Sequence, residues 1–177
     1  SSLYGVRRER EDPMKLSHYM LAFAIAVPTL ARAQDAVKPA GPAPQVALAK
    51  LQGNVAEIGF APEQQRWEAN IDLWKARLDK TGKLTKADIK KMQNAFSRME
   101  ANVSKLIAPG EKERWIANRD LWQIVMGMSG MPSETDAAMM SAVFAKMQAN
   151  IATIADAEEK ERWAANAELW KSTIDRM

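Results

Sequence analysis

ERWIANRDLW, from Glu113 to Trp122, is one of three near-copies of the same ten residues. The other two are QRWEANIDLW, from Gln65 to Trp74, and ERWAANAELW, from Glu161 to Trp170. Each copy follows the previous one after 48 residues, and all 6 tryptophans of the chain lie at the third and tenth positions of a copy. A fixed period over three copies indicates tandem structural repeats.

A second repeated segment precedes each copy: LQGNVAEI (51–58), MEANVSKL (99–106) and MQANIATI (147–154). Its apolar residues recur three and four positions apart, as on one face of an α-helix, and no segment alternates with the period of a strand. The sequence therefore predicts an all-α fold of three tandem αα-hairpins. We expect six helices, at roughly 44–59, 62–80, 85–107, 110–127, 133–155 and 157–176.

Local signals support these boundaries. Thr85 and Ser133 are each followed three residues later by an aspartate, which is typical of a capping box with Asp in place of the usual Glu. Gly82 and Gly127 lie where the second helix of a hairpin should end, so we expect them to form left-handed C-caps.

The tryptophans form a stripe on the second helix of each hairpin. Trp115 and Trp122 are seven residues apart, which is two turns or roughly 10.5 Å along one face. A single hairpin cannot bury such a stripe, whereas hairpins that stack on one another can. We therefore expect the indoles to pack between hairpins, in a six-helix bundle or a short solenoid. Three repeats slightly favour the compact bundle, and the alternative role is a row of aromatic platforms for flat ligands.

Polar residues recur beside this stripe. Buried amides need partners, so we expect the asparagines of the first and second helices to bond across each hairpin, with ligand anchoring as the alternative. The arginines that precede the first tryptophans are expected at the edge of the stripe, either solvated or with their guanidinium groups stacked on indoles or paired with acids. The alternative role is contact with an anionic ligand. The asparagines are Asn54, Asn70, Asn102, Asn118, Asn150 and Asn166, and the arginines are Arg66, Arg114 and Arg162.

The second and third repeats are joined by a methionine-rich segment, VMGMSGMPSETDAAMM. Met126 and Met140 replace apolar residues of the first repeat and are expected in the core, whereas Met128, Met131 and Met139 replace lysines and are expected near the surface. Three hypotheses remain open: thioethers that fill gaps, a docking patch over residues 126–140 for a protein partner or a second copy, and a Cu(I) or Ag(I) site. The metal hypothesis rests on Met126, Met128 and Met131, whose M-x-M-x-x-M spacing suits a soft ion.

The N-terminal residues are typical of a secretory signal peptide. Within residues 1–33, a start at Met14 is followed by the apolar run MLAFAIAVPTL and then by Ala31-Arg32-Ala33, so we expect cleavage after Ala33. The run has 11 residues, and a membrane-spanning helix needs about 20. Residues 34–43 form a Pro/Ala-rich linker, and residues 44–177 form the repeat domain, divided into 44–80, 85–127 and 133–177. We expect a periplasmic or secreted protein with no transmembrane segment in the mature chain.

Composition limits the function classes. From Gln34 onward the chain has 20 Lys and Arg against 19 Asp and Glu, which argues against nucleic-acid binding. It has no cysteine, its single histidine is His18 in the leader, and no nucleophile or phosphate-binding motif occurs. We therefore expect the protein to have no enzymatic activity and to bind no cofactor other than the possible Cu(I). The sequence favours an exported helical-repeat binding or scaffold protein acting through protein or small-ligand contacts, and the alternative is a Met-rich periplasmic Cu(I)- or Ag(I)-binding protein.

Overall fold

The computed structural model describes residues 44–78, 80, 84–128 and 132–177. Six helices and no strand lie in these ranges, which confirms the all-α prediction. The predicted signal peptide, the linker, Gly82 and Met131 lie outside the described residues. The helices are α1 (Pro44–Ala56), α2 (Ala61–Leu78), α3 (Lys86–Val103), α4 (Pro109–Gly127), α5 (Glu134–Ala152) and α6 (Ala157–Ile174).

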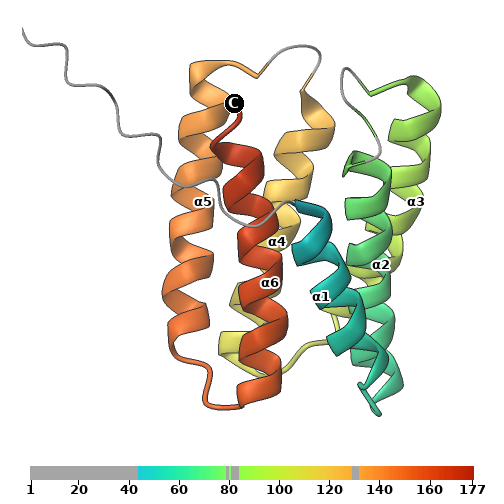
Figure 1. Ribbon diagram of the computed structural model, residues 1–177, viewed down its shortest axis with the longest axis vertical. Coiled ribbons are helices and arrows are strands. Elements are labelled where there is room, and N and C mark those ends of the chain that lie inside the picture. Colours follow the sequence, from blue (N-terminus) through green and yellow to red (C-terminus); the bar gives the residue numbers. More distant parts are fainter. Residues whose placement is uncertain (1–43, 79, 81–83, 129–131) are drawn as a thin grey trace, which may run out of the picture. The chain divides into compact units, whose positions relative to one another are not determined.

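The helices of residues 44–177 form a closed ring with an approximate threefold repeat (Figure 1). The second helices of the hairpins, α2, α4 and α6, run parallel around the axis, and α1, α3 and α5 run antiparallel to them. Each outer helix contacts two inner ones, the inner helix of its own repeat and that of the repeat before it. The ring closes because α1 packs along α6 just as α3 packs along α2, so the fold is a bundle and not an open solenoid.

The closest helix pairs are not those of one sequence repeat. α3 lies more closely along α2 than along α4, and α5 lies more closely along α4 than along α6. In the described residues, no Cα atom of one inner helix comes within 8 Å of a Cα atom of another. Side chains therefore fill the axis and hold the three inner backbones apart.

Two triangles of indoles fill the axis. Trp67, Trp115 and Trp163 form one, with ring centroids 4.7–5.0 Å apart, and Trp74, Trp122 and Trp170 form the other, with centroids 4.5–4.6 Å apart. All six contacts are edge-to-face, the arrangement that the aromatic quadrupole favours. Because each ring is at most 1% exposed, the prediction that the indoles join the hairpins is confirmed. No indole face remains for a flat ligand.

A ring of asparagines lies between the two indole triangles. The Nδ2 of Asn70 donates to Asn166, that of Asn166 to Asn118, and that of Asn118 back to Asn70, over 2.9–3.0 Å. Each Oδ1 accepts a second bond from a tryptophan Nε1 at 2.8–2.9 Å. The three amides are fully buried, and together with the indoles they form a closed set of six hydrogen bonds. The donors of these second bonds are Trp74, Trp122 and Trp170.

The expected pairing of asparagines across each hairpin is wrong. The amides of the inner helices meet one another because α2, α4 and α6 face a common axis. The outer helices contribute no amide there, although the Sδ of Met99 on α3 lies 3.6 Å from the Nδ2 of Asn118. The outer-helix amides of Asn102 and Asn150 donate instead to the carbonyls of Arg98 and Lys146, four residues earlier in the same helix.

The capping boxes are confirmed at both sites. The hydroxyls of Thr85 and Ser133 accept from the backbone N–H groups of Asp88 and Asp136, whose carboxylates accept in return from the backbone of the capping residues. The hydrogen bonds donated by the Thr85 side chain and backbone lower the pKa of Asp88 to about 2. The bonds from Ser133 likewise lower the pKa of Asp136. These carboxylates therefore remain ionised well below neutral pH.

Two boundary predictions are wrong. Gly127 is not a left-handed cap: it is the last residue of α4, and the C-cap residue is Met128, whose backbone is extended, with φ −66° and ψ 118°. The outer helices end three or four residues earlier than expected. There the backbone N–H groups of Leu106 and Ile154 donate to the carbonyls of Val103 and Ile151, and these turns direct the two apolar side chains onto the core.

The asparagine ring can be tested by replacing Asn118 with alanine. The change leaves two buried donors without an acceptor, the Nδ2 of Asn166 and the Nε1 of Trp170. We expect the free energy of unfolding, measured by urea denaturation, to fall by about 2–5 kcal/mol. Asn102→Ala is the matched control, since Asn102 bonds only within its own helix, and should change stability by less than about 1 kcal/mol. Equal losses in the two variants would contradict the proposed importance of the ring.

Candidate functional site

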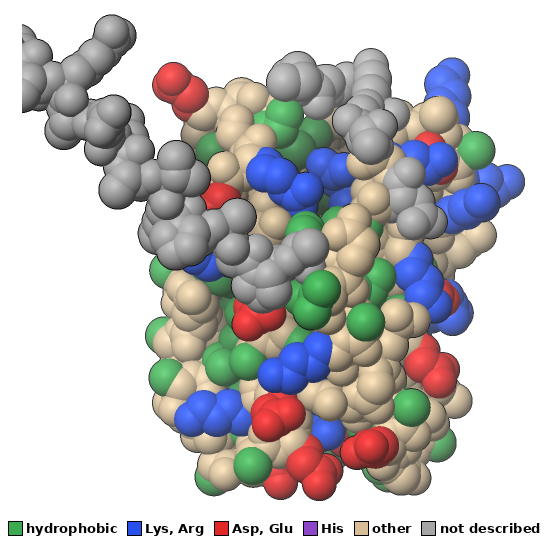
Figure 2. Space-filling model, viewed as in Figure 1, with side chains coloured by type: hydrophobic (Ala, Val, Ile, Leu, Met, Phe, Trp, Pro, Cys, Tyr) green, Lys and Arg blue, Asp and Glu red, His purple; other side chains and the backbone are tan. Residues whose placement is uncertain are grey.

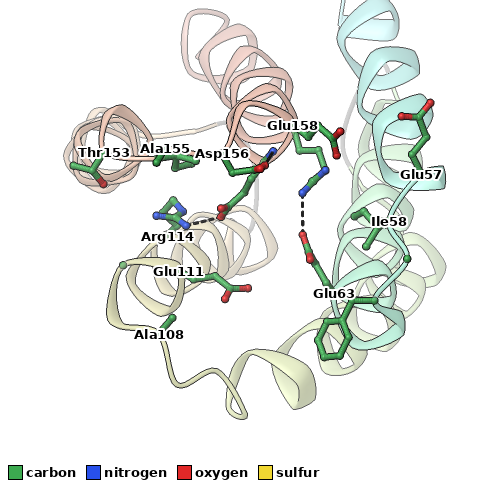
Figure 3. A pocket seen from close by; sticks show the side chains of 16 residues that line it. Glu57, Ile58, Glu63, Ala108, Glu111, Arg114, Thr153, Ala155, Asp156 and Glu158 are labelled. Carbon is green, nitrogen blue, oxygen red and sulfur yellow. Dashed lines mark hydrogen bonds and ion pairs between the residues drawn. The ribbon is translucent and has the colours of Figure 1, made fainter.

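A recess of about 760 Å³ opens at the end of the bundle where α2, α4 and α6 begin. Residues of all three hairpins line it, and most of them lie in the loops that join an outer helix to its inner helix or in the first turns of the inner helices. Figure 3 shows Glu63 of α2 and Glu111 and Arg114 of α4 around the opening. Its volume is within the range of pockets that hold small molecules or side chains of a partner.

Three ion pairs join the hairpins at this end. The Nη2 of Arg66 lies 2.6 Å from Glu111, that of Arg114 lies 2.5 Å from Glu159, and that of Arg162 lies 3.2 Å from Glu63. Each arginine thus reaches the first turn of the next inner helix, and the third pair returns to the first repeat. The carboxylates lie at helix N-termini, where the backbone dipole also favours a negative charge.

The arginines are more buried than the sequence indicated. They are 4–7% exposed, and the guanidinium groups of Arg66 and Arg114 lie 5.8 and 5.9 Å from the ring centroids of Trp115 and Trp163. Stacking on indoles is therefore observed for these two, and the expected pairing with acids is observed for all three. The solvated alternative is wrong for all three. Within the described residues, each Nε is buried without a hydrogen-bond partner. A contact between Arg66, Arg114 or Arg162 and a ligand stays a prediction.

The lining of the recess is acidic. Six carboxylates and two guanidinium groups line it, a formal charge of −4. Three of the carboxylates are held in the ion pairs, and that of Asp156 accepts from the backbone N–H of Glu159 as the N-cap of α6. Glu57 and Glu158 are exposed and have no ion-pair partner in the part of the chain that the structure describes. Red side chains gather at the lower end of the face in Figure 2, where the inner helices begin.

Two large apolar side chains are exposed at the same end. Phe60 lines the recess and is 63% exposed, and Ile107, which precedes the lining residue Ala108, is 93% exposed. Sequence reasoning did not single out either residue. The available signal was divergence between the repeats, because the position of Phe60 is occupied by Ala108 in the second repeat and by Asp156 in the third.

The described methionines of the methionine-rich segment lie at the opposite end of the bundle, at the end of α4 and in the first two turns of α5. Met140 is fully buried and Met126 packs on the core, as expected. Met139 is 45% exposed, also as expected, but Met128 is half-buried and packs against the core. Met131, the third residue of the proposed metal site, lies outside the described residues. Metal binding by Met126, Met128 and Met131 and docking through Met128, Met131 and Met139 stay predictions.

No protein-family model, curated protein or solved structure matches the chain. None of the described helices has both the length and the apolar character needed to cross a membrane. In the same residues, no group of three or more His, Asp or Glu side chains is arranged to hold a metal ion.

The inter-repeat ion pairs can be tested by Glu159→Gln, which leaves the buried guanidinium of Arg114 without its carboxylate. We expect the free energy of unfolding to fall by about 2 kcal/mol or more, because an unpaired buried charge is costly. Glu158→Gln is the matched control: it removes an unpaired carboxylate from the same helical turn and should cost less than about 1 kcal/mol. If urea titration shows the same loss in the free energy of unfolding for both variants, the ion pair adds no stability beyond the interaction of a first-turn carboxylate with the helix dipole.

The copper hypothesis predicts one tight Cu(I) site in the wild-type protein. Titration under reducing conditions should show stoichiometric binding that disappears in the double variant Met128→Leu, Met131→Leu, because leucine retains the bulk of the side chain without its sulfur. Met147→Leu, which changes a fully buried core methionine, should leave the titration unchanged. A wild-type protein without a tight site would reject the hypothesis.

Proposed function

We propose that the chain is an exported helical-repeat binding or scaffold protein that acts through contacts with a protein or a small ligand at the recess. The single observation that supports this most is the contrast between the core and this end of the bundle. The axial side chains bond to one another, whereas the recess is open, polar and lined by exposed carboxylates and the exposed ring of Phe60.

The recess is built in the way that binding sites on repeat proteins are built. Its frame, the ion pairs and the indole triangle below them, is the same in all three repeats, so the lining loops are held on a rigid base. The loops themselves differ: residues 58–60 read Ile-Gly-Phe, residues 106–108 read Leu-Ile-Ala, and residues 154–156 read Ile-Ala-Asp. A conserved frame with variable loops is a common arrangement for recognition.

An enzyme is the less favoured reading of the same recess. Its titratable side chains are carboxylates and arginines, and three of the carboxylates are each held in an ion pair. Glu57 and Glu158 have no ion-pair partner among the described residues, but they are exposed to solvent and no ion pair holds them in place. General acid–base catalysis needs a positioned group that is free to exchange a proton with a substrate. The export that we propose rests on the signal-peptide pattern of residues 1–33.

A capture experiment tests the binding proposal. Ala155 is an exposed lining residue, so Ala155→Trp should fill part of the recess without disturbing the core. Tagged wild-type protein, the Ala155→Trp variant and Ala149→Trp, which changes an exposed residue of α5, would be used to recover partners from a periplasmic extract. Native mass spectrometry of the recovered protein would detect small ligands as well as proteins.

We expect the wild-type protein and Ala149→Trp to retain the same partner or ligand, and Ala155→Trp to lose it. Retention by all three proteins would place binding elsewhere on the molecule. Recovery of nothing by any of them would contradict the proposed function.

A further inference from the structure

A narrow acidic seam extends from the recess between α1 and α6. A second depression, of about 140 Å³, lies there, and Glu57, Glu158 and Arg162 line both it and the recess. Glu161 adds a third carboxylate. All three glutamates are exposed, and within the described ranges none has an ion-pair partner. The seam is therefore continuous with the recess, and its negative charge is not neutralised by ion pairs among the described residues.

Most of this charge is absent from the two equivalent seams. The position of Glu57 is Lys105 in the second repeat and Thr153 in the third, and the position of Glu158 is Pro62 in the first repeat and Gly110 in the second. Only the third carboxylate, Glu161, has an acidic equivalent, Glu113 in the second repeat, and the first repeat has Gln65 there. Since the helices pack in the same way at all three seams, the fold itself does not require acidic residues here. The α1–α6 seam departs from the repeat in one direction, toward negative charge.

Two hydrogen-bond donors in the seam lack acceptors. The Nδ2 of Asn54 is buried and has no partner among the described residues, although the equivalent amides of Asn102 and Asn150 donate to carbonyls of their own helices. Arg162 is 7% exposed and lines both depressions, and its Nε is likewise buried without a partner. Buried donors normally have acceptors, so the seam has donors for an oxygen as well as carboxylates for a cation.

We propose that the α1–α6 seam and the adjoining recess bind a peptide segment of a protein partner that carries lysine or arginine beside an apolar residue. The basic side chain pairs with Glu57 and Glu158, and a backbone carbonyl of the segment accepts from the amide of Asn54 or from the Nε of Arg162. The apolar residue covers the exposed ring of Phe60. The proposal rests on the proposed binding function and specifies its ligand class.

The carboxylates, the two unpaired donors and the ring of Phe60 together favour a basic peptide over a metal ion or a polyamine as the ligand. A divalent metal ion would need three or more converging ligands, and the described residues hold no such group. A polyamine would satisfy the carboxylates but has no carbonyl oxygen for the two donors and little apolar surface for Phe60. Arginine fits best, because its planar guanidinium can bond to two carboxylate oxygens at once.

Fluorescence anisotropy with two labelled synthetic peptides tests this. One peptide of ten residues contains two arginines and one phenylalanine among glycines and serines, and the other has glutamate in place of each arginine. The seam variant is Glu57→Thr with Glu158→Gln, in which Glu57 takes the residue type of the third repeat. The control variant is Glu100→Gln with Glu113→Gln, which removes the same charge from exposed positions of α3 and α4.

We expect the wild-type protein and the control variant to bind the arginine peptide with the same affinity and to reject the glutamate peptide. The seam variant should bind the arginine peptide about fivefold more weakly or worse, and Phe60→Ser should also weaken it. Added salt should lower the affinity of the wild-type protein because the carboxylates are exposed. Circular dichroism should show that both double variants keep the helical fold.

Equal binding of the two peptides, or an equal loss in the seam and control variants, would overturn the proposal, as would the absence of binding to folded wild-type protein. Such a result would not by itself remove the proposed function. If the capture experiment still showed a partner that Ala155→Trp loses, the recess would remain a binding site for a different chemistry.

Discussion

The structure depends on the requirement that α2, α4 and α6 share one axis that is filled by side chains. Each inner helix places an indole, an amide and a second indole on the axis at successive turns, and the three amides bond in a closed circle. The indole Nε1 groups bond to the same amides, so a shift of one helix along the axis would break bonds to both neighbours. The asparagines thus set the register, and the tryptophans set the spacing of the backbones.

This constraint also explains why the two ends of the bundle differ. The same direction of all three inner helices collects their N-termini, and with them the carboxylates of the first turns, at one end. The buried arginines compensate three of these carboxylates and link the hairpins in a circle. The acidic side chains that remain are those on which the repeats differ, and they lie around the recess and the α1–α6 seam.

The sequence predicted the repeats, the six helices and the burial of the tryptophans because each depends on local spacing. It did not predict that the asparagines of the inner helices would bond to one another, since this follows from closure of the ring, which no single hairpin encodes. The burial of Arg66, Arg114 and Arg162 was missed for the same reason, because their partners lie in the next repeat. Gly127 was predicted as a cap from its residue type, but the extended backbone of Met128 ends the helix instead. Phe60 and Glu57 are visible only by comparing the loops across the three copies.

The contact between α6 and α1 resembles those between α2 and α3 and between α4 and α5, yet no loop connects its two helices. Side-chain chemistry alone therefore maintains one of the three joints, and the connecting loops at the other two are not what holds those helices together. The fold therefore does not depend on which hairpin comes first in the chain. A circular permutant that joins the end of α6 to the start of α1 and opens between α2 and α3 would retain every axial bond of the native molecule.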